Sequence, residues 1–533
     1  MTPLPDWLLP LPDAEMMRAV DRWAIEERGV DGLELMERAG AGVARAVERL
    51  APDGPVTVLC GKGNNGGDGL VVARLLRDAG RPLTVVCVTP PQELSGDARV
   101  NLERLPGQRP VALSGAPWSA AQEGQAEERH DELFPSDGVV VDALLGTGFQ
   151  GEPHGEVAQA IDAINRAGAP VLSVDVPSGV DASSGIIAGR AVSASLTVTF
   201  HAFKPGLWIR PGKAHAGEVQ RIDIGIPRGA PGIPSIGLIA SSVLECLPRR
   251  GASSTKFRSG HVLVVGASQG LTGAVAMSAR ASMRAGAGYV TACVPASLEA
   301  ILAVTAAPEV MVRGLPEEDG SLTAESLASV LEASEHAGAL ALGPGLGRSD
   351  GARRFARMLA QAASVPIVLD ADGLNAHAGR LAELVGRAPA TVLTPHAGEL
   401  GRLLGIDSQA VEADRLRCVR AASEQSAAVV VLKGDDTLIA TPDGRVAVSA
   451  GASPALATAG TGDVLTGVIA ALLAQGLDAF TAAAAGVWLH AQAGREAAAA
   501  VGANEAVIAS DVIAALGPAR AAAGREPGGG RDV

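Results

Sequence analysis

Short runs of Val, Leu and Ile alternate with amphipathic stretches along the chain. In the first half these apolar runs predict strands at Val56–Cys60, Leu83–Val88, Val139–Asp142, Val171–Asp175 and Leu196–Phe200. Apolar residues three and four positions apart predict helices at Glu15–Arg28, Glu34–Leu50, Leu70–Ala79, Gly96–Leu105 and Glu156–Ala167. Continuous apolar runs are typical of strands that are buried on both faces. We therefore predict a Rossmann-like three-layer αβα domain with a parallel sheet.

A second α/β series follows the Pro- and Gly-rich stretch at residues 228–235. Its predicted strands are Val262–Val265, Val290–Val294, Ala339–Leu342, Ile367–Asp370, Val392–Thr394 and Val429–Leu432. A hairpin is predicted at Leu438–Thr441 and Val446–Ser449, and an Ala-rich helical region runs from Thr461 to about Leu516. The pattern predicts α/β domains at residues 1–230 and 236–520, with a frayed tail at 521–533.

Composition narrows the class of protein. Of the 533 residues, 47% are hydrophobic and 19% are charged, which indicates packed cores rather than disorder. The formal net charge of −14 argues against a nucleic-acid partner. The five scattered cysteines form no CxxC pair, and the apolar run Val464–Leu477 is too short to span a membrane. We expect a cytoplasmic protein without a membrane partner, and a homo-oligomer.

Polar loops follow three strands of the first domain, at Gly61–Gly69, Asp142–Glu152 and Asp175–Asp181. The first loop formally matches a dinucleotide fingerprint, but no acidic residue follows about 20 positions later. Ligands of open α/β sheets bind beyond the carboxyl ends of the strands, where these loops would meet. Backbone amides of Gly146–Gly151 are suited to cradling phosphates there.

Two chemical roles are expected at this edge. Asn65, Asp142 and Ser178 would converge as hard oxygen ligands for a small cation. Asp175 is an acid–base candidate facing the substrate, with a cap for the next helix as the alternative.

The second domain carries its own candidate at Ala459–Asp463, a Gly-rich turn that precedes an apolar helical run. Free amides at the start of that helix would attract an anion, and Asp463 could take a proton from a hydroxyl that attacks a phosphoryl group. A plain helix cap is the alternative. Lys433–Thr437 follows a strand and would line a nucleotide pocket. Asp370 and Asp372 are either close to Mg²⁺ or caps of the next helix.

From about Glu15 to Gly225, the chain resembles the NAD(P)H-hydrate epimerase domain of the NAD(P)H-hydrate repair family. The matching motifs are LMERAG at 35–40, GNNGGDG at 63–69, DALLGTGFQGE at 142–152, DVPSGVD at 175–181, and TF with KPGL at 199–207. The resemblance implies inversion at C6 of a hydrated nicotinamide ring and a potassium site at Asn65, Asp142 and Ser178. It implies substrate contacts at Asn64, Asn65, Gly66, Gly67, Asp68, Gly146, Thr147, Gly148, Phe149, Gln150, Gly151, Glu152 and Asp175.

From about Ser241 to Ala515, the chain resembles the ribokinase-like superfamily and, within it, the ADP-dependent NAD(P)H-hydrate dehydratases. LGPGLG, LDADGLN, LTPHAGE, LKGDDT and AGTGDVL occur in the order of that family. The resemblance implies substrate contacts at Ala274, Gly345, His396 and Asp463. It implies AMP contacts at Lys433, Gly434, Asp435, Asp436, Thr437 and Gly462. One departure is Ser453-Pro454-Ala455, where the family tends to have Asn-Pro-Gly.

Together these resemblances imply a bifunctional isomerase and lyase acting on hydrated NADH and NADPH. Asp463 and Asp175 would be catalytic, ADP would be the phosphoryl donor, K⁺ would serve the first domain and Mg²⁺ the second. A vitamin-precursor or sugar kinase with an accessory domain would share the AGTGD segment but form a stable phosphorylated product. A non-catalytic nucleotide-binding scaffold is the other alternative.

Overall fold

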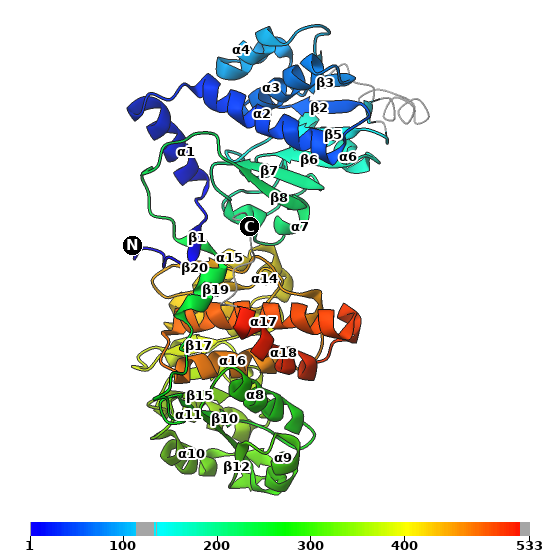
Figure 1. Ribbon diagram of the computed structural model, residues 1–533. Coiled ribbons are helices and arrows are strands. Elements are labelled where there is room, and N and C mark those ends of the chain that lie inside the picture. The colour runs from blue at the N-terminus through cyan, green and yellow to red at the C-terminus, as the bar shows by residue number, and fades with distance from the viewer. Residues whose placement is uncertain (1, 113–132, 135, 523–533) are drawn as a thin grey trace. The chain divides into compact units, whose positions relative to one another are not determined.

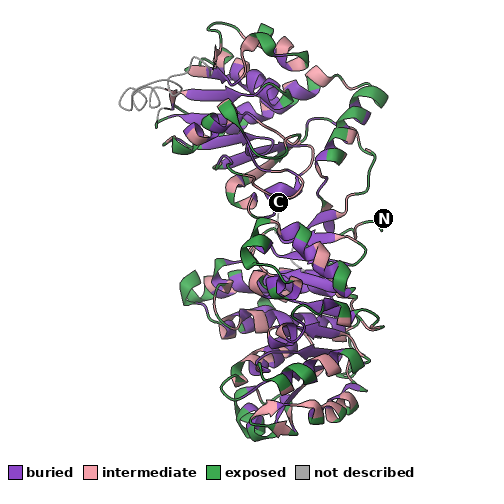
Figure 2. Cartoon of the chain, turned by 180° about the vertical axis from the view of Figure 1, so that it is seen from behind, coloured by how far each residue is buried: buried purple, intermediate pink, exposed green. Residues whose placement is uncertain are grey.

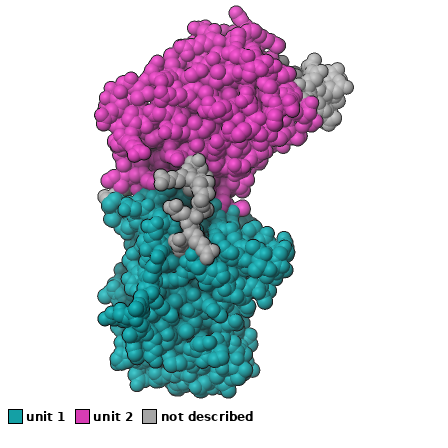
Figure 3. Space-filling view, in the orientation of Figure 1, with its two compact units in different colours: residues 1–9, 237–533 teal, residues 10–236 magenta. Residues whose placement is uncertain are grey.

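The computed structural model describes residues 2–112, 133–134 and 136–522. The chain divides into two compact units, Pro10–Ile236 and Met1–Leu9 with Gly237–Val533, which Figure 3 colours separately. The nine N-terminal residues thus group with the second unit. Of the tail predicted to fray, residues 523–533 lie outside the described part of the chain, and Ala522 ends a helix.

The first unit is built on a parallel sheet with the strand order β4-β3-β2-β5-β6-β7-β8. The strands are β2 (Val56–Cys60), β3 (Leu83–Cys87), β4 (Val111–Ala112), β5 (Val139–Ala143), β6 (Val171–Val174), β7 (Leu196–Phe200) and β8 (Glu218–Ile222). Four of these strands, β2, β5, β6 and β7, consist entirely of buried residues, as expected for a sheet covered on both faces.

Helices cover both faces of this sheet (Figure 1). They are α1 (Ala14–Arg22), α2 (Gly32–Leu50), α3 (Asn64–Asp78), α4 (Gly96–Arg104), α6 (Gly155–Arg166) and the short α7 (Lys213–Ala216). Apolar residues of α2 and α3 share one core with Val56 and Val58 of β2. Residues of α6 share the opposite core with Leu59 of the same strand. The alternation of side chains along β2 therefore separates two helical layers.

The second unit has an eleven-stranded sheet with the order β1-β9-β20-β19-β18-β17-β16-β15-β10-β11-β12. Its strands are β1 (Leu8–Pro10), β9 (Ile236–Ile239), β10 (His261–Val265), β11 (Tyr289–Pro295), β12 (Val310–Leu315), β15 (Ala339–Leu342), β16 (Ile367–Leu369), β17 (Thr391–Leu393), β18 (Val429–Leu432), β19 (Leu438–Ala440) and β20 (Val446–Val448). Pairing is parallel from β12 to β18 and antiparallel through the β18–β19–β20 segment. A separate small hairpin is formed by β13 (Glu317–Glu318) and β14 (Ser321–Leu322).

One helical layer of this unit consists of α8 (Thr272–Arg284), α16 (Thr461–Ala474), α17 (Ala479–Val501) and α18 (Ala509–Ala522), which share a core with Val262 and Val264 of β10. The other helices are α9 (Glu299–Thr305), α10 (Leu327–Ser334), α11 (Asp350–Ala362), α12 (Asp372–Asn375), α13 (Ala397–Leu404), α14 (Ser408–Ala413) and α15 (Arg415–Ser426). Figure 2 shows buried residues running along the strands of both units, with exposed residues on the outer helices. Within the described residues, no helix is long and apolar enough to cross a membrane.

The predicted fold class, two αβα domains with parallel sheets, is confirmed. Several element boundaries were wrong. The helix predicted to begin at Leu70 begins at Asn64, inside the Gly-rich segment, and the helix predicted to reach Arg28 ends in a π-helical turn at Trp23–Glu27. The sequence prediction also missed β8, β9 and β12. β8 lies at the edge of its sheet, and its half-exposed residues lack a continuous apolar run.

Candidate active sites

The first unit holds a cavity of about 760 Å³ at the carboxyl ends of its strands. Its walls include eight of the predicted substrate contacts, namely Asn64, Asn65, Asp68, Gly146, Thr147, Gly148, Phe149 and Asp175. The other five do not line it: Gly66 and Gly67 are buried in α3, and Gln150, Gly151 and Glu152 lie on the exposed side of their loop.

Glycines bring the start of α3 close to the strand ends. A Cβ on Gly61 would lie 1.9 Å from the carbonyl oxygen of Leu144, and one on Gly66 would lie 1.9 Å from that of Gly61. No larger residue fits at either position without moving the backbone. This close approach places Asn65 and Asp68 at the edge of the sheet, beside the loop that follows β5.

Both carboxylate oxygens of Asp175 accept hydrogen bonds at the cavity. Its backbone has a positive φ of 67° directly after β6. The side chain accepts hydrogen bonds from Lys204 Nζ at 2.7 Å and from Thr147 N at 3.0 Å. Thr147 Oγ1 and Thr199 Oγ1 also donate to it. Burial acts to raise the pKa of Asp175, but the charge of Lys204 and these hydrogen bonds outweigh it and hold the pKa below its ordinary value.

Two further carboxyl groups, Asp68 and Asp21, line the same cavity. Burial, reinforced by the charges of Asp175 and Asp21, raises the pKa of Asp68 well above its ordinary value. Burial also raises the pKa of Asp21, against the opposing charge of Lys204. Neither side chain has a hydrogen-bond or ion-pair partner among the described residues. The cavity therefore contains one carboxylate held ionised and two carboxyl groups biased towards the protonated form.

The three predicted cation ligands converge on one loop. Asp142 is fully buried and accepts hydrogen bonds from Ser173 Oγ, Ser178 N and Ser178 Oγ. Asn65 Nδ2 donates to the carbonyl of Leu145 at 2.9 Å, and Leu145 N donates to Ser178 Oγ at 2.9 Å. Burial raises the pKa of Asp142, and no cationic side chain offsets it within the described residues. This all-oxygen set with one buried carboxylate fits a hard monovalent cation.

In the second unit, an ion-pair cluster surrounds the start of α16. Lys433 Nζ lies 2.9 Å from Asp370 Oδ1 and 3.8 Å from Glu399 Oε2. Thr466 Oγ1 donates to the other oxygen of Asp370 at 2.7 Å. The carboxyl groups of Asp370 and Glu399 and the ammonium of Lys433 all act on Asp463. The structure thus brings together residues from β16, α13, β18 and α16.

Asp463 lies in the first turn of α16, after Gly460 with a positive φ of 89°. Burial raises its pKa to about 7, reinforced by Asp370 and Glu399 and opposed by Lys433. A Cβ added to Gly462 would lie 3.5 Å from Lys433 Nζ, so the free amides of this turn and the ammonium face the same space. This arrangement suits an anion beside a base that titrates near neutral pH.

The remaining predicted substrate contacts lie around this cluster. His396 caps α13, its Nδ1 accepting from Gly398 N, while its own backbone N–H donates to Glu399. Ala274 lies in the first turn of α8, which is joined to α16 by a hydrogen bond from Ser278 Oγ to Asp463 O. Gly345 needs its positive φ of 62° in a loop whose next glycine, Gly347, donates to Asp372.

A buried ion pair shapes the loop at 433–437. Arg415 Nε lies 3.0 Å from Asp436 Oδ2, and both side chains are almost fully enclosed. Arg415 also donates to the carbonyl of Lys433, and Thr437 closes the turn on Gly434. The buried ion pair with Arg415 therefore fixes Asp436 and, with it, the loop. Among the other predicted nucleotide contacts, Lys433 lies close to Gly462, Gly434 is exposed, Asp435 is half-buried and Thr437 is buried.

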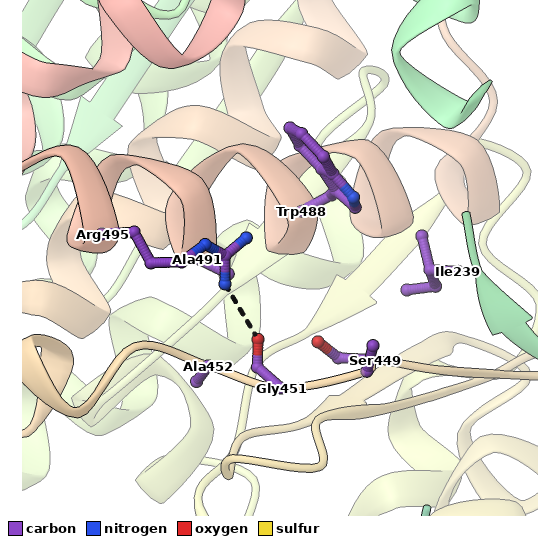
Figure 4. Close-up of a pocket in the computed structure, with 8 residues that line it drawn as sticks. Ile239, Ser449, Gly451, Ala452, Trp488, Ala491 and Arg495 are labelled. Carbon is purple, nitrogen blue, oxygen red and sulfur yellow. Dashed lines mark hydrogen bonds between the residues drawn. The ribbon is translucent and has the colours of Figure 1, made fainter. Parts of the chain in front are cut away.

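A pocket of about 240 Å³ adjoins this loop, because Ala452 N donates to the carbonyl of Asp435 at 3.1 Å. Figure 4 shows Trp488 and Arg495 of α17 on one side and the 449–452 segment on the other. Arg495 Nη1 donates to Gly451 O at 3.4 Å. The half-buried indole of Trp488 gives the pocket an apolar wall.

Among the residues of these sites that sequence reasoning did not assign to a role are Asp21, Lys204, Thr199, Glu399, Arg415 and Thr466. The scarcity of lysine, five in 533 residues, was a usable signal for Lys204, which is 1% exposed. Asp21 left no such signal, because an acidic residue on an amphipathic helix looks like part of its solvated face.

Comparisons with known proteins agree along the chain. Residues 262–516 match a family model described as NAD(P)H-hydrate dehydratase, and residues 32–206 match one described as YjeF-related protein N-terminus. The bifunctional NAD(P)H-hydrate repair enzyme Nnr of Moorella thermoacetica is 41% identical, over 94% of either chain. The enzyme of the same name from Escherichia coli is 34% identical, over 94% of this chain and 92% of its own.

Among solved structures, similarity extends to an ADP/ATP-dependent NAD(P)H-hydrate dehydratase from Bacillus subtilis, co-crystallised with ATP and Mg²⁺. It is 27% identical with a TM-score of 0.47, and the match covers 54% of this chain and 98% of that one.

Proposed function

This chain belongs to the family of bifunctional NAD(P)H-hydrate repair enzymes, and we propose from that premise that its two units catalyse two linked reactions. The first unit interconverts the R and S forms of hydrated NADH and NADPH. The second dehydrates the S form at the expense of ADP, which leaves AMP and phosphate. The observation that carries the proposal is the paired arrangement in each unit, where a lysine binds one carboxylate beside a second carboxyl group of raised pKa.

Dehydration begins at Asp463. Its carboxylate takes the proton from the hydroxyl of the hydrated ring, and the hydroxyl oxygen attacks the β-phosphorus of ADP. AMP leaves, and the phosphate ester then eliminates phosphate with a ring proton to restore the dihydronicotinamide. The amides of the first turn of α16 and the ammonium of Lys433 stabilise the charge on the transferring phosphoryl group.

The nucleotide lies along the loop at 433–437, with its phosphates towards Gly462. We assign its base to the pocket in Figure 4, which the Ala452–Asp435 hydrogen bond joins to that loop. At the Ser453-Pro454-Ala455 departure, Ser453 and Ala455 are buried, which supports a nucleotide site that does not depend on their side chains.

Mg²⁺ supplies charge neutralisation during phosphoryl transfer. Asp370 and Asp372 already accept hydrogen bonds from Lys433, Thr466, Gly347 and Arg348. These residues therefore fit an ion held mainly by the phosphates and reached from the chain through water.

In the first unit, Asp175 acts on the hydrated ring, and Asn65, Asp142 and Ser178 would hold potassium. The buried Asp142 supplies the negative charge for that ion, and the loop from Leu145 to Phe149 connects the ion site to the cavity.

The test uses purified protein with mixed R and S hydrates of NADH, Mg²⁺, K⁺ and ADP. Complete return of NADH absorbance, with AMP and phosphate formed in equal amounts, is expected. Return of only the S portion would refute the epimerase assignment. Accumulation of a stable phosphorylated product would identify a kinase instead, and no change at all would favour a binding scaffold.

A further inference from the structure

We propose that Asp68 is the acid catalyst of epimerisation, working opposite the carboxylate of Asp175, and that Asp21 and Lys204 are positioning residues that keep these two carboxyl groups in different charge states. The inference rests on the epimerase activity proposed above and adds to it the roles of individual side chains.

The first argument is placement. The four side chains come from α1, α3, the end of β6 and the segment before Pro205, yet all line the same cavity. Asp68 is only 9% exposed. A substrate in this cavity would therefore meet Asp68 and Asp175 together, largely shielded from bulk water.

The second argument is the lack of partners for Asp68. Other buried aspartates of the same unit collect donors, as Asp142 does with Leu144, Ser173 and Ser178. Asp68 has no hydrogen-bond or ion-pair partner in the part of the chain that the structure describes. Asp68 lines the cavity and has no protein partner there, so a ligand in the cavity would supply the contacts of its carboxyl group.

The third argument is the electrostatic asymmetry of the cavity. Lys204 Nζ donates to Asp175 at 2.7 Å and to Thr199 Oγ1 at 2.7 Å, so its charge is directed at Asp175. Burial raises the pKa of Asp68, and the charges of Asp175 and Asp21 add to it, which together outweigh the opposing charge of Lys204. One site thus holds a proton acceptor and a proton donor at the same pH, the arrangement that paired acid–base catalysis needs.

The chemistry at C6 needs both groups. The C6 hydroxyl stands next to ring nitrogen N1 and is a poor leaving group unless it is protonated. Asp68 donates a proton to that oxygen, the C6–O bond breaks, water leaves, and the N1 electron pair forms an N1=C6 double bond. A second water adds to the opposite face of C6, its proton passes to Asp175, and the electron pair returns to N1. The reverse reaction exchanges the two roles, and proton transfer through water resets the pair.

The experiment follows single-epimer substrate without ADP, so that the dehydratase is silent, and separates R from S by chromatography. Asp68→Asn should slow epimerisation by about 10²–10⁴-fold, the usual range for loss of an acid catalyst. The matched control is Asp78→Asn at the exposed end of the same helix, which should retain wild-type activity. If wild-type protein fails to epimerise, the proposed function falls. If wild type works and Asp68→Asn stays within threefold of it, only this inference falls.

Two further measurements separate catalysis from misfolding. In ¹⁸O-labelled water each inversion should place one solvent oxygen on C6, and inversion that keeps the original oxygen would overturn the mechanism.

The alkaline limb of the pH–rate profile should come from Asp68, which faces Asp21, Asp175 and Lys204. Asp21→Asn should move that limb to lower pH, because a like charge is lost. Lys204→Met should move the acid limb, set by Asp175, to higher pH, and Lys204→Arg should move it back. Unmoved limbs would refute the positioning roles.

Discussion

Replacing Asp463 with Asn tests the chemistry of the second unit most directly. The amide keeps the size of the side chain and its place at the start of α16, but it cannot accept the hydroxyl proton. Loss of a general base typically slows a reaction by about 10²–10⁴-fold. Burial and the neighbouring carboxylates raise the pKa of Asp463 to about 7, so the proposed base titrates close to neutral pH.

The assay is the initial rate of NADH recovery from S-hydrate with saturating ADP and Mg²⁺. Epimerase activity of the same preparation, measured without ADP, is the control, since Asp463 lies in the other unit. A dehydration rate within threefold of wild type, with the epimerase unchanged, would refute the role of Asp463 as base.

The same substitution has an opposite effect on stability. Raising a carboxyl pKa from 3.8 to about 7 corresponds to a penalty of roughly 4 kcal/mol on the ionised folded state, an upper limit. A raised pKa means that this penalty is absent below 3.8, grows as pH rises towards 7 and is constant above it. Asp463→Asn should therefore stabilise the protein more at about pH 8 than at about pH 5. The measurement is the midpoint of thermal unfolding of the second unit, which is identified as the transition that moves when ADP is added. Equal stabilisation at both values would show that Asp463 does not titrate in this range.

Four other predictions follow from the same geometry. The kcat/KM for dehydration should rise with pH through about 7, and Asp370→Asn should move this rise to lower pH, because a like charge beside Asp463 is removed. Replacing K⁺ by a bulky organic cation should slow only epimerisation, and Asp142→Asn should abolish that difference between cations; indifference of wild type would count against the site. Trp488→Ala should raise the KM for ADP more than that for the hydrate in steady-state assays, and equal changes would contradict the base pocket. Asp175→Ala should consume S-hydrate normally and stall with R-hydrate, and adding the Asp463→Asn protein should restore full conversion. If either variant loses both activities, the two-site account is wrong.

The layers of both units were predictable because buried parallel strands appear in the sequence as continuous apolar runs. Val139–Val141 and Val429–Leu432 could be recognised without any tertiary information. The start of α3 was not, because Gly66 and Gly67 have low helix propensity and act through close packing against backbone and Met36. Local propensity is a weak guide where tertiary contacts select the residue. The edge strand β12 was missed because Arg313 and Gly314 interrupt its apolar run.

The candidate sites were predictable where a side chain lies in a distinctive motif at the end of a strand or the start of a helix. Asp175, Asp142 and Asp463 are of this kind, and their roles remain predictions. A motif does not show whether a carboxyl group in it is protonated. Whether Asp68 or Asp175 holds a proton depends on Lys204 and Asp21, which lie far from both in sequence. The sign of a pKa shift is a property of the assembled cavity, because burial and neighbouring charges compete within a few ångströms.

The two sites share one arrangement of charged groups, although they lie on different sheets. In each site a lysine forms an ion pair with one carboxylate: Lys204 with Asp175, and Lys433 with Asp370. A second carboxyl group nearby forms no ion pair of its own among the described residues. The second group, Asp68 or Asp463, then has a raised pKa, which for Asp463 is about 7. Both reactions act on the same hydroxyl of the same ring, which must be protonated to leave as water in one case and deprotonated to attack phosphorus in the other. Two of the five lysines lie in these sites, and replacing Lys204 or Lys433 with a neutral residue should raise the pKa of Asp175 or of Asp463, respectively.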